Sequence, residues 1–425
     1  MLDLNFIRQN PTQVKQACQA KQLDDQVVDQ LLTIDQRWRQ LIQQTEQIRQ
    51  QINQNAADIK KIVSQSQPPP SDKIEHGRQL KQQLKDLEPE LKELETRLEE
   101  LSLQIPNLPA SDVPVGTNEN DNQVIKTWGE KPAFDFQPQH HDQLMTKLDW
   151  LDSKRGVKVA GFRGYFLKNQ AVLLEQALLQ HALNLMIKHD FTPMTVPVLV
   201  KPKTLMGTGF FPWGQEDHYN TQDNKVLIGT AEVPLTSYYM DEVLNHKDLP
   251  IKMAGISSCF RREVGDRGRD TRGLVRVHQF NKVEQVVLTV ANETATQQWH
   301  QKMLGFAEEL LQSLALPYQV VLMCTGDMGA GQRKKYDLET WFPAQNKYRE
   351  THSCSYFNDF QARRLNIRYQ AKDGSLKHVY TLNNTVAATP RLLAAVIENY
   401  QQKDGSIKIP AVLQKLIGTN SVAVA

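Results

Sequence analysis

The sequence predicts an α+β protein in which an N-terminal antiparallel coiled-coil hairpin precedes a mixed domain of strands and helices. Two seams of regularly spaced apolar residues indicate the hairpin. A change to mixed α and β patterns after a proline-bearing stretch indicates the second domain. We therefore expect an N-terminal domain at 1–104, a linker at 105–118 and a larger domain at 119–425, each domain with its own core.

The hairpin is expected over residues 27–103, after a short helical cap at 1–24. Its first seam has apolar residues at largely alternating spacings of four and three, at positions 27, 31, 34, 38, 41, 48, 52, 59 and 63. The stretch SQSQPPPSDK at 64–73 cannot continue a helix. The second seam is formed by Leu80, Leu84, Leu87, Leu91, Leu94, Leu98 and Leu101. Two antiparallel helices are therefore predicted, and Pro89 should kink the second.

The outer faces of the hairpin are rich in glutamine and carry scattered basic residues, while the second helix becomes acidic towards its base. This polarity suits an arm that meets RNA phosphates near its tip. A solvated coiled-coil surface would carry the same charges, so the pattern alone leaves both interpretations open.

Composition excludes several classes of protein. The 50 basic and 48 acidic residues nearly cancel, so any RNA site must be a local patch, and no DNA partner is expected. The four cysteines have no CxxC spacing, which argues against a disulfide framework or a cysteine-based zinc site and favours a reducing compartment. We find no signal peptide and no apolar run of about 18 residues. A cytoplasmic protein without a membrane partner is expected.

The segment from Phe260 to Glu284, FRREVGDRGRDTRGLVRVHQFNKVE, is expected to form a charged hairpin. Six of the sixteen positions from Arg261 to Arg276 are arginine, and guanidinium groups bind phosphate oxygens well. Alternation places Arg261 and Glu263 on one face, together with a polar set after the loop: Arg276, His278, Phe280, Lys282 and Glu284. Val275, Val277 and Val283 would take the other face. The polar surface suits a nucleotide triphosphate; a solvated hairpin with Asp266 and Asp270 paired to arginines is equally compatible.

A helix is predicted at 389–401, TPRLLAAVIENYQ, with Thr389 as N-cap and Pro390 at the first helical position. The run 392–397 is apolar on every side, so this helix should be buried. Arg391 in its first turn opposes the helix dipole at a cost of about 0.3–1 kcal/mol, which indicates a bound anion or, alternatively, a nearby carboxylate.

Two further segments carry polar residues suited to a binding site. In LIGTAEVPL (227–235), Glu232 could face an ammonium group, although Thr230 before an acidic first turn is also ordinary helix capping. In KYRETHSCS (347–355), Glu350 and Ser353 offer oxygen ligands for a hard cation. Strict alternation does not place these two on one face, so a shared metal there needs a bulge or twist. His352 is better explained as a hydrogen-bonded structural histidine.

A helix and a proline-containing strand are predicted before these segments. A helix is expected around 170–188, followed by a strand at 190–200 that is broken by Pro193 and Pro197. Prolines in a strand indicate a sheet edge or an interface.

With these pieces in order, the chain resembles the seryl-tRNA synthetases of bacteria, which are class II synthetases, over essentially its full length. The resemblance rests on the coiled-coil hairpin and on five separate segments: FTPMTVP (191–197), GTAEVPLT (229–236), the arginine hairpin (260–284), RETHSCSYFNDFQARR (349–364) and LNNTVAATPRLLAAVIENYQ (382–401). It implies an antiparallel-sheet catalytic domain flanked by helices. FTPMTVP is similar to the first class II signature, which would place Pro197 at a dimer interface.

The resemblance also implies roles for individual residues. Arg261 would hold the α-phosphate of ATP and the carboxylate of serine. The serine site would further comprise Thr230, Ala231, Glu232, Glu284, Asn383 and Thr385, with Thr230 and Glu232 at the ammonium group. The ATP site would comprise Arg261, Arg262, Glu263, Arg276, Phe280, Arg349, Glu350, Thr351, His352, Ser353 and Arg391. In this set Phe280 would stack on adenine beside Glu263, Arg276 and Arg391 would bind the outer phosphates, and Glu350 and Ser353 would ligate Mg²⁺.

The implied activity is that of an ATP-dependent serine–tRNA ligase. Serine attacks the α-phosphorus of ATP, and the seryl group then passes to the terminal adenosine of tRNA(Ser), with tRNA(Sec) as a further candidate. The arm would grip the tRNA across a homodimer. The rival interpretations are a sibling ligase for another small amino acid or a carrier protein, and a non-enzymatic RNA-binding or scaffold protein. Many relatives have glycine at the positions of Asp190 and Asn384 and serine at that of His352. Whether Arg267, Arg269 and Arg272 touch the tRNA acceptor end is left open.

Overall fold

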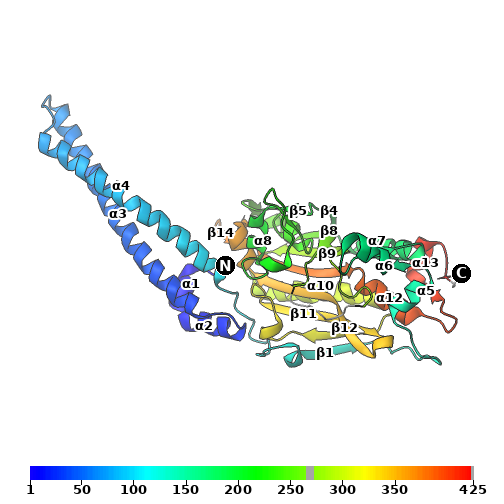
Figure 1. The fold of residues 1–425 in the computed structure, drawn as a ribbon. Coiled ribbons are helices and arrows are strands. Elements are labelled where there is room, and N and C mark those ends of the chain that lie inside the picture. The colour runs from blue at the N-terminus through cyan, green and yellow to red at the C-terminus, as the bar shows by residue number, and fades with distance from the viewer. Residues whose placement is uncertain (265–271, 423–425) are drawn as a thin grey trace. The chain divides into compact units, whose positions relative to one another are not determined.

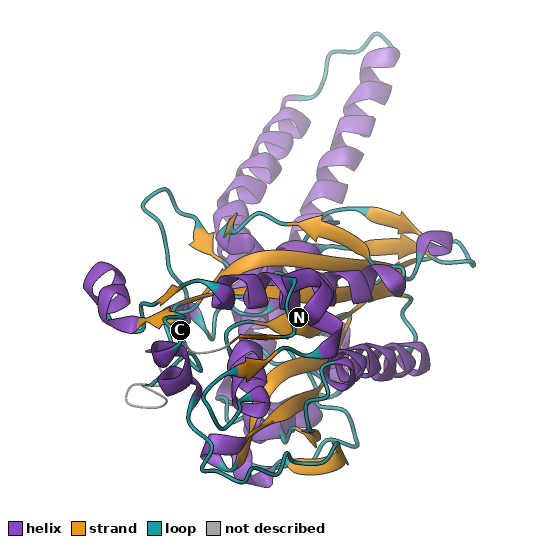
Figure 2. Cartoon of the chain, turned by 90° about the vertical axis from the view of Figure 1, so that its right-hand side faces the viewer, coloured by secondary structure: helices purple, strands orange, loops and turns teal. Residues whose placement is uncertain are grey.

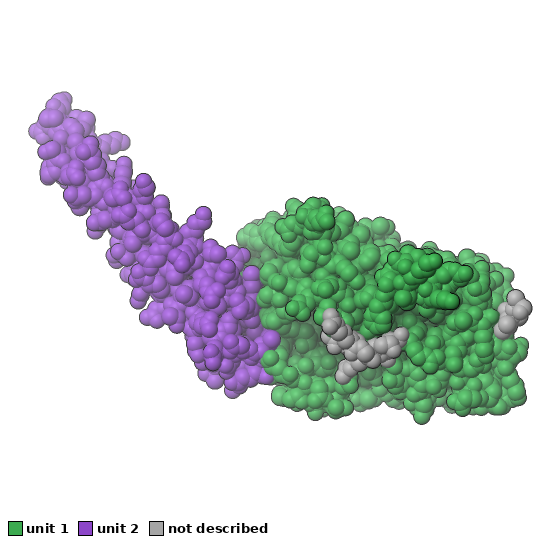
Figure 3. Space-filling view, in the orientation of Figure 1, with its two compact units in different colours: residues 1, 20–22, 107–425 green, residues 2–19, 23–106 purple. Residues whose placement is uncertain are grey.

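The computed structural model describes residues 1–264 and 272–422 of the chain. Arg267, Arg269, Asp266 and Asp270 lie outside the described residues. The chain divides into two compact units, one of residues 2–19 and 23–106 and one of residues 1, 20–22 and 107–425 (Figure 3). The domain boundaries expected from the sequence stay a prediction.

The N-terminal unit is built on the predicted helical hairpin (Figure 1). Its helices are α1 (Leu4–Gln9), α2 (Pro11–Ala20), α3 (Gln26–Ser64) and α4 (Ser71–Gln104). The proline-rich stretch ends α3 and precedes α4, as its lack of helix-forming residues requires. The apolar seams are buried most fully at the base, where α1 and α2 pack against the hairpin through Ile7, Val14, Leu31, Leu98 and Leu101.

The second unit is built around an eight-stranded sheet in the order β1-β10-β11-β12-β15-β9-β8-β4 (Figure 2). All neighbours are antiparallel except β4 and β8. The strands are β1 (Gln123–Trp128), β4 (Thr192–Thr195), β8 (Ile251–Phe260), β9 (Gln279–Thr289), β10 (Tyr318–Leu322), β11 (Lys334–Phe342), β12 (Lys347–Asn358) and β15 (Tyr380–Ala388). The predicted α+β class with an antiparallel sheet is confirmed.

Helices flank this sheet. They are α5 (His141–Lys147), α6 (Ser153–Ala160), α7 (Gln170–Lys188), α8 (Pro202–Thr208), α9 (Glu232–Thr236), α10 (Glu293–Ser313), α11 (Phe360–Leu365), α12 (Arg391–Tyr400) and α13 (Ala411–Ile417). Both α7 and α10 pack on β9 and β15. Small sheets are formed by β2 (Leu151–Asp152) with β3 (Phe166–Leu167), β5 (Leu199–Val200) with β6 (Val226–Leu227), β7 (Val243–Asn245) with β13 (Arg368–Gln370) and β14 (Leu376–His378), and β16 (Ile407–Lys408) with β17 (Ser421–Val422).

The prolines of 190–200 have the positions that their chemistry requires. Pro193 lies in β4, which is an edge strand of the large sheet, and Pro197 is exposed between β4 and β5. The expected single strand is therefore two short ones. Asp190 has φ +59°, a conformation that glycine adopts at no steric cost, which explains the glycine expected there in relatives. Of the helices described, none is both long and apolar enough to cross a membrane.

Candidate active site

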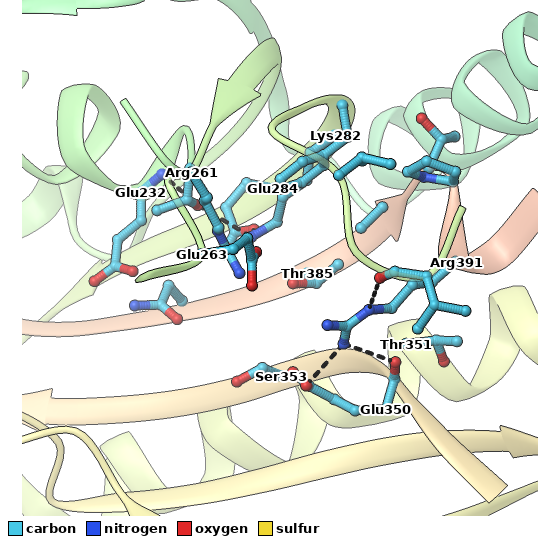
Figure 4. A pocket seen from close by; sticks show the side chains of 18 of the residues that line it. Glu232, Arg261, Glu263, Lys282, Glu284, Glu350, Thr351, Ser353, Thr385 and Arg391 are labelled. Carbon is cyan, nitrogen blue, oxygen red and sulfur yellow. Dashed lines mark hydrogen bonds and ion pairs between the residues drawn. The ribbon is translucent and has the colours of Figure 1, made fainter. Parts of the chain in front are cut away.

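A cleft of about 260 Å³ is lined by residues of β9, β12 and β15 of the large sheet. Alternation along two central strands supplies its floor: Phe280, Lys282 and Glu284 come from β9, and Asn383 and Thr385 come from β15. Figure 4 shows Glu232, Arg261 and Glu284 near one another on one side, and Glu350 and Arg391 on the other. The sequence prediction of a polar face on this hairpin therefore locates the site.

Only part of that predicted face is correct, because β9 begins at Gln279. Residues 272–278 are a bent segment, which we call the return segment, and strand alternation does not apply to it. Val275 and Val277, expected on the opposite face, line the cleft, whereas the ring of His278 lies 2.9 Å from the carbonyl oxygen of Arg261 outside it.

A bulge in β12 brings three of its residues into the cleft. Leu338 pairs with His352 and Glu339 pairs with Glu350, so Thr351 is the extra residue and the alternation is reset. Glu350, Thr351 and Ser353 consequently all line the cleft. The sequence required such a bulge if Glu350 and Ser353 were to share a metal.

His352 is not brought into the cleft. It is 1% exposed, and its Nε2 lies 2.9 Å from the carbonyl oxygen of Val386 and its Nδ1 2.9 Å from Oγ1 of Thr351. Its pKa falls to about 4 because burial penalises the charged ring. The bulge turns this ring into the core, so a contact of His352 with ATP, which stays a prediction, would have to use its backbone.

Arg391 joins the first turn of α12 to β12 and to the return segment. Its Nη1 donates to the Glu350 carboxylate at 2.9 Å, and its Nε donates to the carbonyl oxygen of Val275 at 3.0 Å. Burial opposes a charge on Glu350, but Arg391 and Lys335 outweigh it and lower the pKa of Glu350 to about 2. Of the two partners considered for Arg391, a bound anion and a nearby carboxylate, this structure shows the carboxylate of Glu350. The pair lies in a cleft that an anion could enter.

The start of α12 differs from the expectation. Pro390 occupies the cap position and the helix begins at Arg391. Thr389 therefore lies one residue before the cap, and its hydroxyl donates to Oε1 of Glu175 at 2.6 Å. Sequence spacing could not reveal this buried carboxylate on α7.

The arginine-rich segment supplies cations to several places. Arg261 lines the cleft with its guanidinium 5.3 Å from the ring centre of Phe280. Glu263 also lines it and pairs with Arg276 at 3.0 Å. Arg276 and Arg349 line an adjoining hollow that Glu350 and Arg391 share. Two predicted site residues lie elsewhere: Arg262 is exposed and donates to the carbonyl oxygen of Glu216, and Ala231 is buried in a core cluster.

Arg272, whose role was left open, pairs with Asp142 at 3.1 Å.

The deepest part of the cleft holds two carboxylates and one lysine. Burial, followed by the charge of Glu284, raises the pKa of Glu232 to about 8, and burial also raises the pKa of Glu284. Lys282 forms an ion pair with Glu284 and donates to Oγ1 of Thr230 at 3.0 Å. Among the described residues, Nδ2 of Asn383 is a buried donor without a hydrogen-bond partner. This end is suited to a small ligand with an ammonium group and a polar side chain.

Several cleft residues received no role from the sequence. Lys282 was placed on the polar face but not assigned, although its position beside Glu284 was a usable signal. Lys335 alternates with Asp337 and Glu339 along β11, the pattern of a polar strand face. Val275, Val277 and Gln332 carried no signal, because apolar and amide side chains in a cleft resemble those elsewhere.

The donor set beside Arg391 fits a hard divalent cation. Glu350 offers an ionised carboxylate and Ser353 a hydroxyl, both lining the cleft. Asp337 on β11 is the register partner of Ser353, and its Oδ1 is one of the buried oxygens without a hydrogen-bond partner in the described part of the chain.

Known proteins match this chain along its whole length. The family model of the seryl-tRNA synthetase N-terminal domain matches residues 1–109, and that of the tRNA synthetase class II core domain (G, H, P, S and T) matches residues 216–400. Serine–tRNA ligases of Deinococcus radiodurans and Caldicellulosiruptor bescii are 44% and 42% identical to it. The first covers 99% of each chain, and the second covers 99% of this chain and all of the relative.

Solved structures agree. The seryl-tRNA synthetase of Pyrococcus horikoshii complexed with ATP superposes with a TM-score of 0.93 at 37% identity over all of both chains. The cytoplasmic serine–tRNA ligase of Naegleria fowleri in complex with AMP gives 0.88 at 31%, over 100% of this chain and 99% of the other. From its helical arm to its bulged cleft, the chain belongs to the seryl-tRNA synthetase family of class II aminoacyl-tRNA synthetases.

Proposed function

We propose that this chain is a serine–tRNA ligase that forms seryl-adenylate from L-serine and ATP and transfers the seryl group to the 3′-terminal adenosine of tRNA(Ser). The observation that carries the proposal is the cleft with two unlike ends. One end presents arginines beside an ionised carboxylate, and the other presents Glu232, Glu284 and the unpartnered amide of Asn383. A nucleotide triphosphate suits the first and a small hydroxyl amino acid suits the second.

Each end acts by position and charge. The carboxylate oxygen of serine attacks the α-phosphorus beside Arg261, and the P–O bond to pyrophosphate breaks. Phe280 stacks on adenine beside Glu263, and Arg276 and Arg391 take the outer phosphates. The adenosine hydroxyl of the tRNA then attacks the seryl carbonyl carbon, and AMP leaves. Neither step uses a dedicated acid or base, because in-line positioning and charge neutralisation supply most of the rate.

Residues at the other end select serine. Glu232 and Thr230 receive the ammonium group, and Glu284, Asn383 and Thr385 surround the hydroxyl. Alanine would leave the Nδ2 of Asn383 without a partner, which a buried site penalises strongly. Glu350 and Ser353 would hold Mg²⁺, which supplies charge neutralisation on the phosphates. Thr351 and Arg349 flank them. Arg262 stays a predicted member of the ATP site and Ala231 of the serine site.

The arm formed by α3 and α4 is proposed to grip tRNA(Ser). Basic side chains near its tip are exposed, among them Lys60, Lys61, Arg78, Lys81 and Lys85. Arg78 pairs with Glu75 only at 3.6 Å between exposed groups, so a phosphate could displace that contact at little cost. tRNA(Sec) remains a second candidate substrate.

A homodimer is proposed from the edge of the large sheet. The edge strand β4 has exposed residues, Pro197 is exposed after it, and several large apolar side chains nearby in sequence are exposed as well: Val157, Val159, Phe162, Phe166, Leu173 and Leu199. An exposed edge strand with apolar residues is a place where a second subunit can pair. A cytoplasmic location accords with the four free cysteines and with the site of protein synthesis.

The decisive measurement is serine-dependent exchange of pyrophosphate into ATP without tRNA, across a panel of amino acids. Serine should support it, and threonine and alanine should not. Exchange driven by another amino acid but not by serine would exclude the assignment. A variant lacking residues 30–100 should retain exchange, which also shows that it folds, and should fail to charge tRNA.

Mixed dimers test the cross-subunit arm. A subunit without the arm, paired with a full-length Arg391→Ala subunit, should charge tRNA, although neither homodimer does. Failure of the mixed dimer alone would mean that the arm serves its own active site.

A further inference from the structure

A buried histidine outside the cleft contacts the backbone of the return segment. His141, the first residue of α5, is 0% exposed. Its Nε2 lies 3.0 Å from the backbone nitrogen of Leu274, and its Nδ1 lies 2.7 Å from Oε1 of Glu398. A backbone N–H can only donate, so Nε2 must be the unprotonated acceptor and Nδ1 must carry the proton that is donated to Glu398. The two contacts fix the ring and its tautomer.

Glu398 belongs to the same helix as Arg391. The two residues are seven positions apart on α12, about two turns, and therefore share one side of the helix. Glu398 is 0% exposed and its Oε2 accepts from the backbone N–H of Ala344 at 3.2 Å. Arg391 holds the carbonyl oxygen of Val275, and Glu398 holds the N–H of Leu274 through His141. One helix thus fixes both sides of the Leu274–Val275 stretch.

The fit between ring and segment is close. Gly273 has φ +69°, and a Cβ built on it would lie 2.1 Å from Nε2 of His141, so only glycine allows the ring to approach the backbone. Beyond this contact, Val275 and Val277 form part of the cleft wall. Displacement of Leu274 would therefore move both the wall and the carbonyl that orients Arg391.

Resting on the proposed function, we propose that His141, with its tautomer fixed by Glu398, is a positioning residue for adenylate formation. It holds the return segment in the conformation that shapes the nucleotide end of the cleft. It does not touch the substrates, and its effect is expected on ATP rather than on serine, because the residues it positions lie at Arg391 and not at Glu232.

A metal site at this cluster, and the Asp142–Arg272 pair as the main anchor of the return segment, are both less consistent with the geometry. His140, His141 and Glu398 place ligand atoms within 4.8 Å of one another, but both ring nitrogens of His141 are already used in hydrogen bonds. A second anchor, the ion pair of Asp142 with Arg272, is a weaker constraint, because the arginine side chain is 65% exposed and such surface pairs contribute little. The buried histidine is the stronger of the two anchors.

Two substitutions separate the contacts of His141. His141→Asn keeps a donor near the place of Nδ1 but removes the acceptor for Leu274, whereas His141→Gln keeps an acceptor near the place of Nε2. In pyrophosphate exchange, His141→Asn should raise the KM for ATP about tenfold, the order expected when a buried N–H loses its acceptor, and leave the KM for serine within about twofold. His141→Gln should restore most of the ATP affinity. Hydrogen exchange at the Leu274 amide should quicken in His141→Asn only.

The matched control is His140→Asn, since His140 is adjacent but contacts Asp142 at 2.7 Å instead of the return segment. It should leave both KM values unchanged. Equal losses for ATP and serine, or equal losses in the Asn and Gln variants with lowered thermal stability, would assign His141 a purely structural role and overturn the proposal. If His141→Asn does not fold, His141→Gln decides alone: a raised KM for ATP with an unchanged Leu274 amide would contradict it. Failure of the wild-type protein to exchange with serine would instead reject the proposed function.

Discussion

The two ends of the cleft carry the same kinds of charged groups and treat them in opposite ways. At the end that we assign to phosphates, Glu350 lies against Arg391 and near Lys335, and its pKa falls to about 2. At the end that we assign to serine, Glu232 is 7% exposed, faces Glu284, and has its pKa raised to about 8. One cleft therefore holds a carboxylate that is always ionised and another that is mostly neutral near pH 7.

This difference indicates which charged group of a ligand each end can accept. The phosphate end has an internal ion pair that an incoming anion can rearrange: the phosphate takes Arg391, and Glu350 becomes available to a cation. The serine end has two buried carboxylates and one lysine, Lys282, so an added ammonium group would allow Glu232 to ionise as well as Glu284. We therefore expect the phosphates of ATP at one end and the ammonium group of serine at the other to satisfy both.

The largest effect is expected from removing the cation of the phosphate end. Arg391→Ala should slow adenylate formation by about 10²–10³-fold, because stabilisation of developing phosphate charge is lost. Exchange kinetics with saturating serine measure this. Arg272→Ala is the matched control, since Arg272 is exposed and paired to Asp142 outside the cleft; it should change the rate by less than about twofold. Equal rates for wild type and Arg391→Ala would contradict the assignment of this end.

Local chemistry made much of the fold predictable. Heptad spacing and the proline-rich tip predicted α3 and α4, and the helix at 170–188 was predicted with the bounds that α7 has. Alternation on β9 placed Phe280, Lys282 and Glu284 on the face that lines the cleft. These successes share one cause: each pattern repeats over several residues of one regular element.

The remaining features depend on contacts between distant segments. The bulge at Thr351 follows from pairing with β11, the hydrogen bond of the Thr389 hydroxyl depends on Glu175 on α7, and the failure of alternation at 275–278 follows from a segment held by α5 and α12. The raised pKa of Glu232 follows from burial beside Glu284, which is 52 positions away. None of these has a local signature, so sequence patterns cannot reveal them.

A smaller effect, confined to serine, is expected at the other end. Glu232→Gln keeps the shape of the carboxyl group and the neutral state that burial favours, so the fold should be retained. The ammonium of serine then loses its charged partner, and the KM for serine should rise about 10- to 100-fold, the cost of one charge-assisted hydrogen bond. Glu263→Gln is the comparison at the nucleotide side: it should raise the KM for ATP and spare that for serine. If both variants raised the KM for the same substrate, the assignment of the two ends of the cleft to different substrates would be wrong.

The smallest and most specific effect is expected in the release of a proton from Glu232 when serine binds. With its pKa at about 8, Glu232 binds a proton through most of the range below pH 8 in the free enzyme. The serine ammonium favours the ionised carboxylate, so binding lowers that pKa and a proton must leave. Serine affinity should therefore rise with pH from 6 to 8, with a slope that approaches one proton per site.

Calorimetry in buffers of different ionisation enthalpy measures the proton directly. Near pH 7 the wild-type protein should release close to one proton per serine bound, and Glu232→Gln should release almost none, whereas Glu263→Gln should behave as wild type. Equal release in all three proteins would mean that the proton comes from another group. If the wild-type protein released no proton, Glu232 would already be ionised in the free enzyme. The two ends would then not differ in the state of their carboxylates, and the ionised Glu232 would attract the ammonium group of serine without releasing a proton.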